Sequence, residues 1–156
     1  MEKHTILPFY KKDSKVLILG SFPSRKSREE GFYYAHPQNR FWPVLSSIFE
    51  EEIKDKKAFL EKHHIALYDV CASCEIKGSS DASIKEVIPN NLNEILKESQ
   101  IKIIILNGKT ASNLYKKLFK EIKLPTITLP STSPANATFS LNSLIEEYQI
   151  IKQFTK

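Results

Sequence analysis

The stretch VLILG, residues 16–20, decides the fold of this chain. Its four apolar residues do not alternate with polar ones, which is typical of a strand covered on both faces. Gly20 follows at once, and a glycine there favours a turn and lets backbone amides approach a ligand. Three further runs of the same kind occur along the chain, at residues 65–70, 101–106 and 126–129.

Helical patterns lie between these four runs. Apolar residues recur at the spacing of one buried helix face in residues 41–49, 92–96, 111–119 and 141–151. Strands that alternate with helices favour a mostly parallel sheet with right-handed crossovers. The sequence therefore predicts an α/β fold, a three-layer α/β/α sandwich around a mostly parallel four-stranded sheet, in one domain spanning residues 1–156.

The bulk composition of the chain excludes few classes of protein. The 156 residues include 23 Lys and Arg against 18 Asp and Glu, a net charge of +5, which suits a polyanionic partner without requiring one. No apolar run approaches the roughly 18 residues that a membrane helix needs, and the first residues do not resemble a signal peptide. We expect a soluble, cytoplasmic protein that does not bind a membrane, and a monomer.

The two cysteines, in Cys71-Ala-Ser-Cys74, have the spacing of a redox dithiol or of half a zinc site. A zinc ion needs two more ligands, and His63 and His64 are the only nearby candidates. That pair occupies a Lys-rich helix end where histidine is unremarkable. We therefore favour reduced structural thiols and no metal.

In a parallel sheet, ligands bind beyond the carboxyl ends of the strands. After the first run, Gly20-Ser21-Phe22-Pro23-Ser24 forms a turn, and neither GxxxxGK[ST] nor GxGxxG is present, so a nucleotide cofactor is not indicated. Arg25, Lys26 and Arg28 come next. They fit phosphate contacts and a solvated loop equally well.

The segment GFYYAHPQNRFWPVL, residues 31–45, is rich in aromatic residues. Residues 32–34 are all aromatic and fall on a predicted loop, where they are not expected to be all in the core. Asn39 precedes the apolar helix pattern, the place of an N-cap, with Phe41 and Trp42 packing into the core. From residue type alone, capping is the favoured role of Asn39.

The fourth run is followed by Ser131-Thr132-Ser133-Pro134-Ala135-Asn136, a hydroxyl-rich loop stiffened by proline and leading to a helix. Such a loop can donate several hydrogen bonds to phosphates. It is also compatible with an ordinary connection.

Together, five segments resemble the uracil-DNA glycosylase superfamily, most closely its hypoxanthine-DNA glycosylase branch. In order along the chain they are VLILGSFPS, GFYYAHPQNRFW, ALYDVCASCEIKGSSDASI, ILNGKTA and LPSTSPANA. The resemblance implies an enzyme that flips a deaminated base, most of all hypoxanthine, out of DNA and hydrolyses its N-glycosidic bond. It implies no metal and no organic cofactor.

The chain departs from that family at two positions. Phe22 stands where relatives carry a polar residue in the first catalytic motif, and Ser131 stands where many carry a histidine in the second. The resemblance implies that Asn39 supplies the missing electrostatics as a catalytic amide, in addition to capping.

The resemblance also assigns the remaining site. The residues that it places against the substrate are Gly20, Ser21, Phe22, Pro23, Tyr34, Asp69 and Ser131. Those that it places against DNA are Arg25, Lys26, Arg40, Lys109, Ser133, Pro134 and Asn136.

Several alternatives remain open at this stage. Asp69 either reads the N1–H of hypoxanthine or fixes the loop that follows it, residues 71–80. The substrate is hypoxanthine, or else uracil or another deaminated base. The two missing catalytic side chains also allow a DNA-binding module without catalysis.

Overall fold

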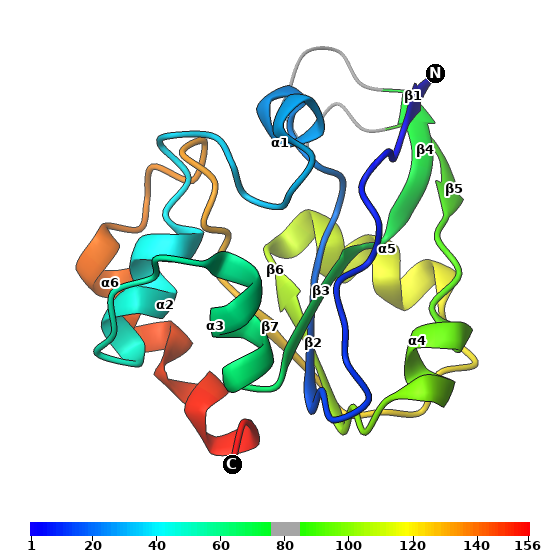
Figure 1. Ribbon diagram of the computed structural model, residues 1–156. Helices are drawn as coiled ribbons and strands as arrows, with labels where there is room; N and C mark the ends of the chain where they lie inside the picture. Colours follow the sequence, from blue (N-terminus) through cyan, green and yellow to red (C-terminus); the bar gives the residue numbers. More distant parts are fainter. Residues whose placement is uncertain (76–84) are drawn as a thin grey trace.

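A four-stranded parallel sheet lies at the centre of the computed structural model, which describes residues 1–75 and 85–156 (Figure 1). Its strand order is β3-β2-β6-β7, so the chain starts in the middle of the sheet and adds strands on both sides. The predicted VLILG strand is one of the two central strands. The four strands are β2 (Val16–Gly20), β3 (Ile65–Asp69), β6 (Ile103–Asn107) and β7 (Thr126–Leu129).

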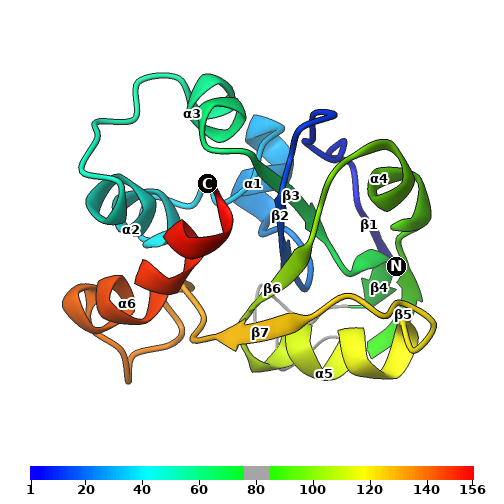
Figure 2. The ribbon, with the colours of Figure 1, turned by 90° about the horizontal axis from the view of Figure 1, so that it is seen from below.

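Side chains of these strands alternate between two buried layers. Ile18 and Leu67 belong to one apolar cluster, whereas Leu17 and Leu19 belong to the other. The first layer is covered by α2 (Phe41–Ile48), α3 (Lys56–Lys62) and α6 (Leu141–Tyr148), and the second by α4 (Asn93–Glu98) and α5 (Lys109–Leu118), as Figure 2 shows. The predicted three-layer sandwich is confirmed.

A second, antiparallel sheet was not predicted. It contains β1 (Glu2–Lys3), β4 (Cys71–Glu75) and β5 (Lys85–Pro89), in the order β1-β4-β5. Residues 71–75 are therefore a strand rather than the start of a loop, and the rest of the predicted loop, residues 76–80, lies outside the described residues. Because β1 has only two residues and β4 has small residues except for Glu75, neither carries a strand pattern.

The basic segment after β2 is also a helix rather than a loop. Ser24 caps α1 (Arg25–Glu30) by accepting a hydrogen bond from the Ser27 amide at 3.1 Å. Helix α1 lies above the carboxyl ends of the central strands in Figure 1. Farther along the chain, α6 continues into a 3₁₀ helix, η2 (Gln149–Phe154).

The expectation that residues 32–34 are not all in the core is confirmed, although Tyr33 itself is a core residue. Its side chain is 1% exposed, while Phe32 and Tyr34 are half-buried against the same core cluster. The chain folds back over the core at Gly31, which ends α1 in the left-handed conformation with φ 78°. The predicted packing of Phe41 and Trp42 into the core is confirmed.

The side chains of both cysteines are buried and are not joined by a disulfide. His63, considered as a zinc ligand, lies 3.0 Å from a carboxylate oxygen of Glu51, and His64 lies 3.4 Å from Asp13. In residues 1–75 and 85–156, no group of three or more metal-ligating side chains is found. Nor does any helix in these two ranges have the length and apolar character needed to cross a membrane.

Candidate active site

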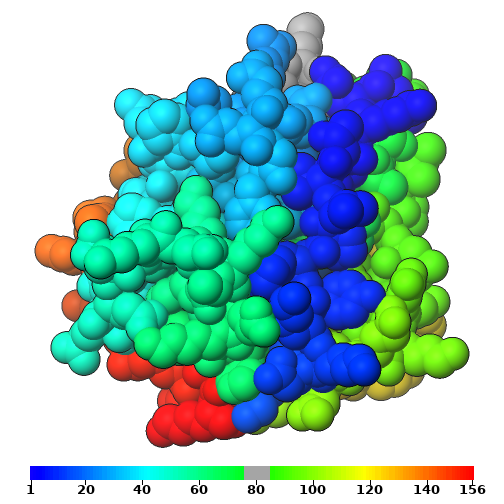
Figure 3. All heavy atoms as spheres, in the orientation of Figure 1, coloured from blue at the N-terminus to red at the C-terminus, as the bar shows by residue number. Residues whose placement is uncertain are grey.

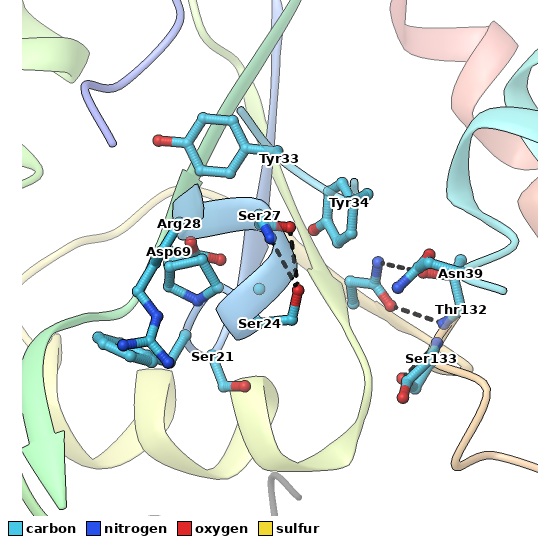
Figure 4. Close-up of a pocket in the computed structure, with 15 residues that line it drawn as sticks. Ser21, Ser24, Ser27, Arg28, Tyr33, Tyr34, Asn39, Asp69, Thr132 and Ser133 are labelled. Atoms are coloured by element: carbon cyan, nitrogen blue, oxygen red, sulfur yellow. Dashed lines mark hydrogen bonds between the residues drawn. The ribbon is translucent and has the colours of Figure 1, made fainter. Parts of the chain in front are cut away.

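A pocket opens where β2, β3 and β6 end, at the edge that the parallel topology predicts for a ligand (Figure 4). It is lined by residues from the ends of these strands, from α1, and from the loops before α2 and after β7. The predicted residues among them are Gly20, Ser21, Phe22, Pro23, Tyr34, Asn39, Asp69, Ser131 and Ser133. The lining residues to which the family resemblance assigned no role are Ser24, Ser27, Arg28, Tyr33, Asn107 and Thr132.

Gly20 and Asp69 face each other across adjacent strands at the pocket. A Cβ atom at Gly20 would lie 2.5 Å from Asp69 Oδ1 and 3.2 Å from the Tyr34 hydroxyl oxygen. Only glycine therefore lets β2 end this close to the carboxylate.

Asp69 is 3% exposed and has a partner that sequence reasoning missed. His4 Nε2 lies 2.9 Å from Asp69 Oδ2, and the His4 side chain is itself 3% exposed. A single histidine near the N-terminus, 65 positions from Asp69, gives no motif that would have identified it.

Two tyrosines lie close enough to Asp69 to respond to its charge. Burial raises the pKa of the Tyr33 hydroxyl, and the negative charge of Asp69 raises it further. The pKa of Tyr68 is raised by the same two causes in the same order. Both side chains therefore remain neutral, and the Tyr33 hydroxyl donates a hydrogen bond to the Leu7 carbonyl oxygen at 2.9 Å.

Two aromatic rings form other parts of the pocket wall. Tyr34 has φ 56°, an uncommon conformation for a bulky residue, and its ring stacks on Phe41 at 3.9 Å between centroids. The guanidinium of Arg28 lies over the Phe22 ring at 5.2 Å. Each ring is thus backed on one face by a neighbour.

Asn39 is fixed by its side-chain oxygen. Its Oδ1 accepts a hydrogen bond from the Phe41 amide at 2.9 Å, which settles the orientation of the side-chain amide. The N-cap residue of α2 is Arg40. Asn39, which was predicted to be the N-cap, therefore lies one residue before it. Within the described residues no acceptor is recorded for Asn39 Nδ2, which remains able to donate to a ligand.

The loop after β7 is held in place from within the protein. Asn107, at the end of β6, donates to Thr132 Oγ1 at 3.1 Å and accepts from the Thr132 amide at 3.1 Å. The Tyr148 hydroxyl donates to the Pro130 carbonyl oxygen at 2.7 Å. Burial raises the pKa of Tyr148, so it remains a donor. The position of Asn107 at the end of a predicted strand was the signal that could have identified it.

Arg40, for which a phosphate contact is predicted, has hydrogen-bond partners within the protein. The guanidinium donates to the carbonyl oxygens of Ser133 at 2.7 Å and Asn136 at 2.9 Å, and also to those of Thr132 and Phe139. These bonds turn the side chain into the loop and occupy most of its five donors. Arg40 organises the loop that carries the predicted DNA contacts.

The other predicted DNA contacts lie around the pocket. Arg25, Lys109 and Pro134 are exposed, and Lys26 pairs with Glu30 at 3.1 Å. A second cleft shares Ser131 and Ser133 with the pocket and extends past Lys109 and Asn136. Helix α6 follows this loop and begins at Leu141, where the apolar pattern predicted a helix.

Comparisons with known proteins agree with this architecture. Residues 7–153 match the family described as the uracil DNA glycosylase superfamily. Two curated relatives are named hypoxanthine DNA glycosylase. The protein from Methanosarcina barkeri is 32% identical over 87% of this chain and 89% of the relative. The protein from Methanosarcina acetivorans is 35% identical over 83% of this chain and 85% of the relative. A solution NMR structure from M. acetivorans, described as a candidate uracil DNA glycosylase, covers 99% of both chains with a TM-score of 0.83 and 28% identity. The chain belongs to the uracil DNA glycosylase superfamily.

Proposed function

We propose that this DNA glycosylase removes hypoxanthine from DNA that contains deoxyinosine. The observation that carries the proposal is that one pocket is lined by both the Asp69 carboxylate and the Asn39 amide. The first is a hydrogen-bond acceptor suited to a base N–H, and the second is a donor suited to a departing base. The names of the two Methanosarcina relatives support the same substrate.

The reaction begins with base flipping, because the glycosidic bond is out of reach while the base is stacked in the duplex. The flipped base lies against Tyr34 and Phe22, whose rings are backed by Phe41 and Arg28. Rings fixed in this way hold a flat base at little entropic cost.

Asp69 distinguishes hypoxanthine from adenine. The N1–H of hypoxanthine donates to the carboxylate, whereas N1 of adenine carries no proton and presents a lone pair to it. A site built to accept a hydrogen bond rejects the analogue that lacks the donor, because its own buried polar group is then left unpaired. Asp69 is buried enough for that penalty to be large.

Asn39 stabilises the charge that develops on the base. As the bond between C1′ and the base nitrogen breaks, its electron pair moves onto the base and the sugar acquires oxocarbenium character. Asn39 Nδ2 donates to the base, and its place at the start of α2 adds the positive end of the helix dipole. Water then adds to C1′, and its proton is transferred to the base or to solvent.

DNA contacts surround this pocket. Ser133, Pro134 and Asn136 lie on the loop organised by Arg40, and the exposed Pro134 is placed to wedge into the duplex. Arg25, Lys26 and Lys109 contact phosphates on either side. Ser131, Gly20, Ser21 and Pro23 complete the wall next to the flipped nucleotide.

The test uses labelled duplexes that contain inosine, uracil, xanthine or no lesion. After incubation with the protein, alkali cleaves the strand at each abasic site. Strand breaks confined to inosine, or far faster there, are the expected result. Cleavage mainly at uracil would show that uracil, and not hypoxanthine, is the main substrate. Binding without any strand break would overturn the enzymatic proposal.

A further inference from the structure

The two carboxylate oxygens of Asp69 have different surroundings. Oδ2 lies 2.9 Å from His4 Nε2. Oδ1 lies next to Gly20, at the pocket, and the described residues provide no hydrogen-bond donor to it. One oxygen is therefore held by the protein while the other faces the space that a ligand would occupy.

The tautomer of His4 follows from its second ring nitrogen. The Ile6 backbone amide donates to His4 Nδ1 at 3.3 Å, so Nδ1 carries a lone pair. The ring proton of the neutral imidazole is then on Nε2, and it donates to Asp69 Oδ2. His4 thus gives Asp69 a hydrogen bond of fixed direction.

The position of His4 is set by the small antiparallel sheet. Strand β1 pairs with β4, and the His4 amide donates to the Ala72 carbonyl oxygen at 2.7 Å. Glu2 binds Arg28 at 3.1 Å, and Arg28 covers Phe22 in the pocket wall. Figure 3 shows the N-terminal residues, in dark blue, packed beside the lighter blue residues of α1. Two residues of the N-terminal segment therefore contact two walls of the pocket.

A purely structural role explains this pair poorly. Both side chains are almost fully buried, and the His4 ring lies among Phe22, Tyr33 and Tyr68. Burying a polar pair among aromatic rings gains little stability over apolar residues of the same volume. The pair nevertheless leaves Oδ1 at the pocket without a donor from the described residues.

We propose that His4 is a positioning residue of the base pocket, whose Nε2–H fixes Asp69 so that Oδ1 meets the N–H of the flipped base. This inference rests on the proposed function, because it names what orients the group that reads hypoxanthine. It also makes the N-terminal segment part of the site, although it precedes every motif of the family resemblance.

The kinetic test is a double-mutant cycle on inosine duplexes under single-turnover conditions. His4→Phe keeps the ring packing but removes the donor, and we expect excision to fall about tenfold or more. In an Asp69→Ala background the same change should cost less than about twofold, because the reading group is already lost. His4→Gln, whose amide offers both a donor and an acceptor, should recover most of the activity.

A matched control is available at His63, which lies 3.0 Å from Glu51 and away from the residues that line the pocket. His63→Phe should leave excision unchanged, and thermal unfolding of each variant checks that it folds. Equal losses from His4→Phe in both backgrounds, no loss at all, or a Gln variant as poor as the Phe variant would each overturn the inference.

Nitrogen-15 NMR of the histidine side chains tests the same bond without catalysis. His4 should show a protonated Nε2 and an unprotonated Nδ1, and the Nε2 proton should exchange faster with water in Asp69→Ala. An unchanged signal in that variant would refute the His4–Asp69 bond. If the wild-type protein excised no hypoxanthine, the substrate assignment would fail, while this signal would still decide whether His4 holds Asp69.

Discussion

At the residue scale, the two polar atoms of the Asn39 side chain have different surroundings. Asn39 uses its oxygen at the start of α2, which leaves its nitrogen for a ligand in the pocket. Capping and the proposed donation to a departing base are therefore compatible, as expected from the sequence, because they use different atoms. Substitutions that separate the two atoms can test each role independently.

Replacing Asn39 by alanine should lower hypoxanthine excision by about two orders of magnitude or more, because a preorganised donor to the departing base is lost. Loss of the bond to the Phe41 amide should reduce the free energy of unfolding by only about 1 kcal/mol. Asn39→Asp keeps an acceptor for that amide but loses the donor, so it should be as stable as wild type and inactive. Single-turnover excision and urea unfolding measure both quantities.

Asn91 provides a matched control for Asn39. Its Oδ1 accepts from the Asn93 amide at 2.9 Å at the start of α4, the same local geometry outside the pocket. Asn91→Ala should therefore cost similar stability and leave excision unchanged. Activity losses of equal size in the Asn39 and Asn91 variants would contradict a chemical role for Asn39.

Gly20→Ala should impair both folding and activity, because the new methyl group would lie 2.5 Å from Asp69 Oδ1. Relief of that clash requires Asp69 or the end of β2 to move, at a cost of about 1–3 kcal/mol. Thermal unfolding and excision of hypoxanthine measure the two effects. Wild-type values in both assays would show that the carboxylate is not held against Gly20.

At the scale of elements, the loop after β7 takes its shape from side chains far away in the sequence. Arg40 precedes α2, Asn107 ends β6 and Tyr148 ends α6, and all three bind loop residues. The conformation of the loop therefore depends on hydrogen bonds from distant residues, and its own sequence predicts little of its shape. Any contact that it makes with DNA, as proposed, would depend on these three side chains.

Arg40→Lys distinguishes a structural role from a phosphate contact. Lysine keeps the charge but cannot reach the four carbonyl oxygens that the planar guanidinium binds, so stability should fall by about 1–3 kcal/mol. Urea unfolding measures this loss. A fully stable Arg40→Lys protein that binds DNA like wild type would instead favour a direct phosphate contact.

Lys109 is expected to behave in the opposite way, since it is exposed beside the second cleft. Lys109→Ala should leave stability unchanged and reduce by about one the slope of log affinity against log salt concentration. Fluorescence anisotropy with labelled duplexes at several salt concentrations gives this slope. An unchanged slope would show that Lys109 does not contact a DNA phosphate.

At the scale of the whole molecule, burial keeps most of the tyrosines neutral. Hydrogen bonding to Glu98 raises the pKa of Tyr10 to about 12, and burial raises that of Tyr115 to about 12. The pKa values of Tyr33, Tyr68 and Tyr148 are also raised, chiefly by burial. The tyrosines buried on both faces of the sheet should therefore make the free energy of unfolding depend on pH.

The free energy of unfolding should fall as pH rises above about 10, the ordinary tyrosine pKa. The unfolded chain then loses phenolic protons that the folded chain retains, so the unfolded state binds fewer protons and stability decreases with pH. Urea unfolding at pH 8–11 and the tyrosinate absorbance measure this. Normal titration of all tyrosines near pH 10 in the folded protein would contradict the burial described for Tyr33 and Tyr148.

The sequence by itself determined the central sheet, its covering helices and the edge where the pocket lies. The reason is that uninterrupted apolar strands must be covered on both faces, and parallel strands end at one edge. The family resemblance added the residues around Gly20, Asn39 and Ser131, which the structure brings into one pocket.

Only the tertiary structure decided the partners of these residues. His4 lies beside Asp69 because a two-residue strand pairs with β4, and Arg40 turns inward because four carbonyl oxygens converge on it. Such contacts join positions far apart in the chain and leave no periodic pattern. A sequence can therefore indicate where a site lies, while the direction of each hydrogen bond depends on how distant segments pack together.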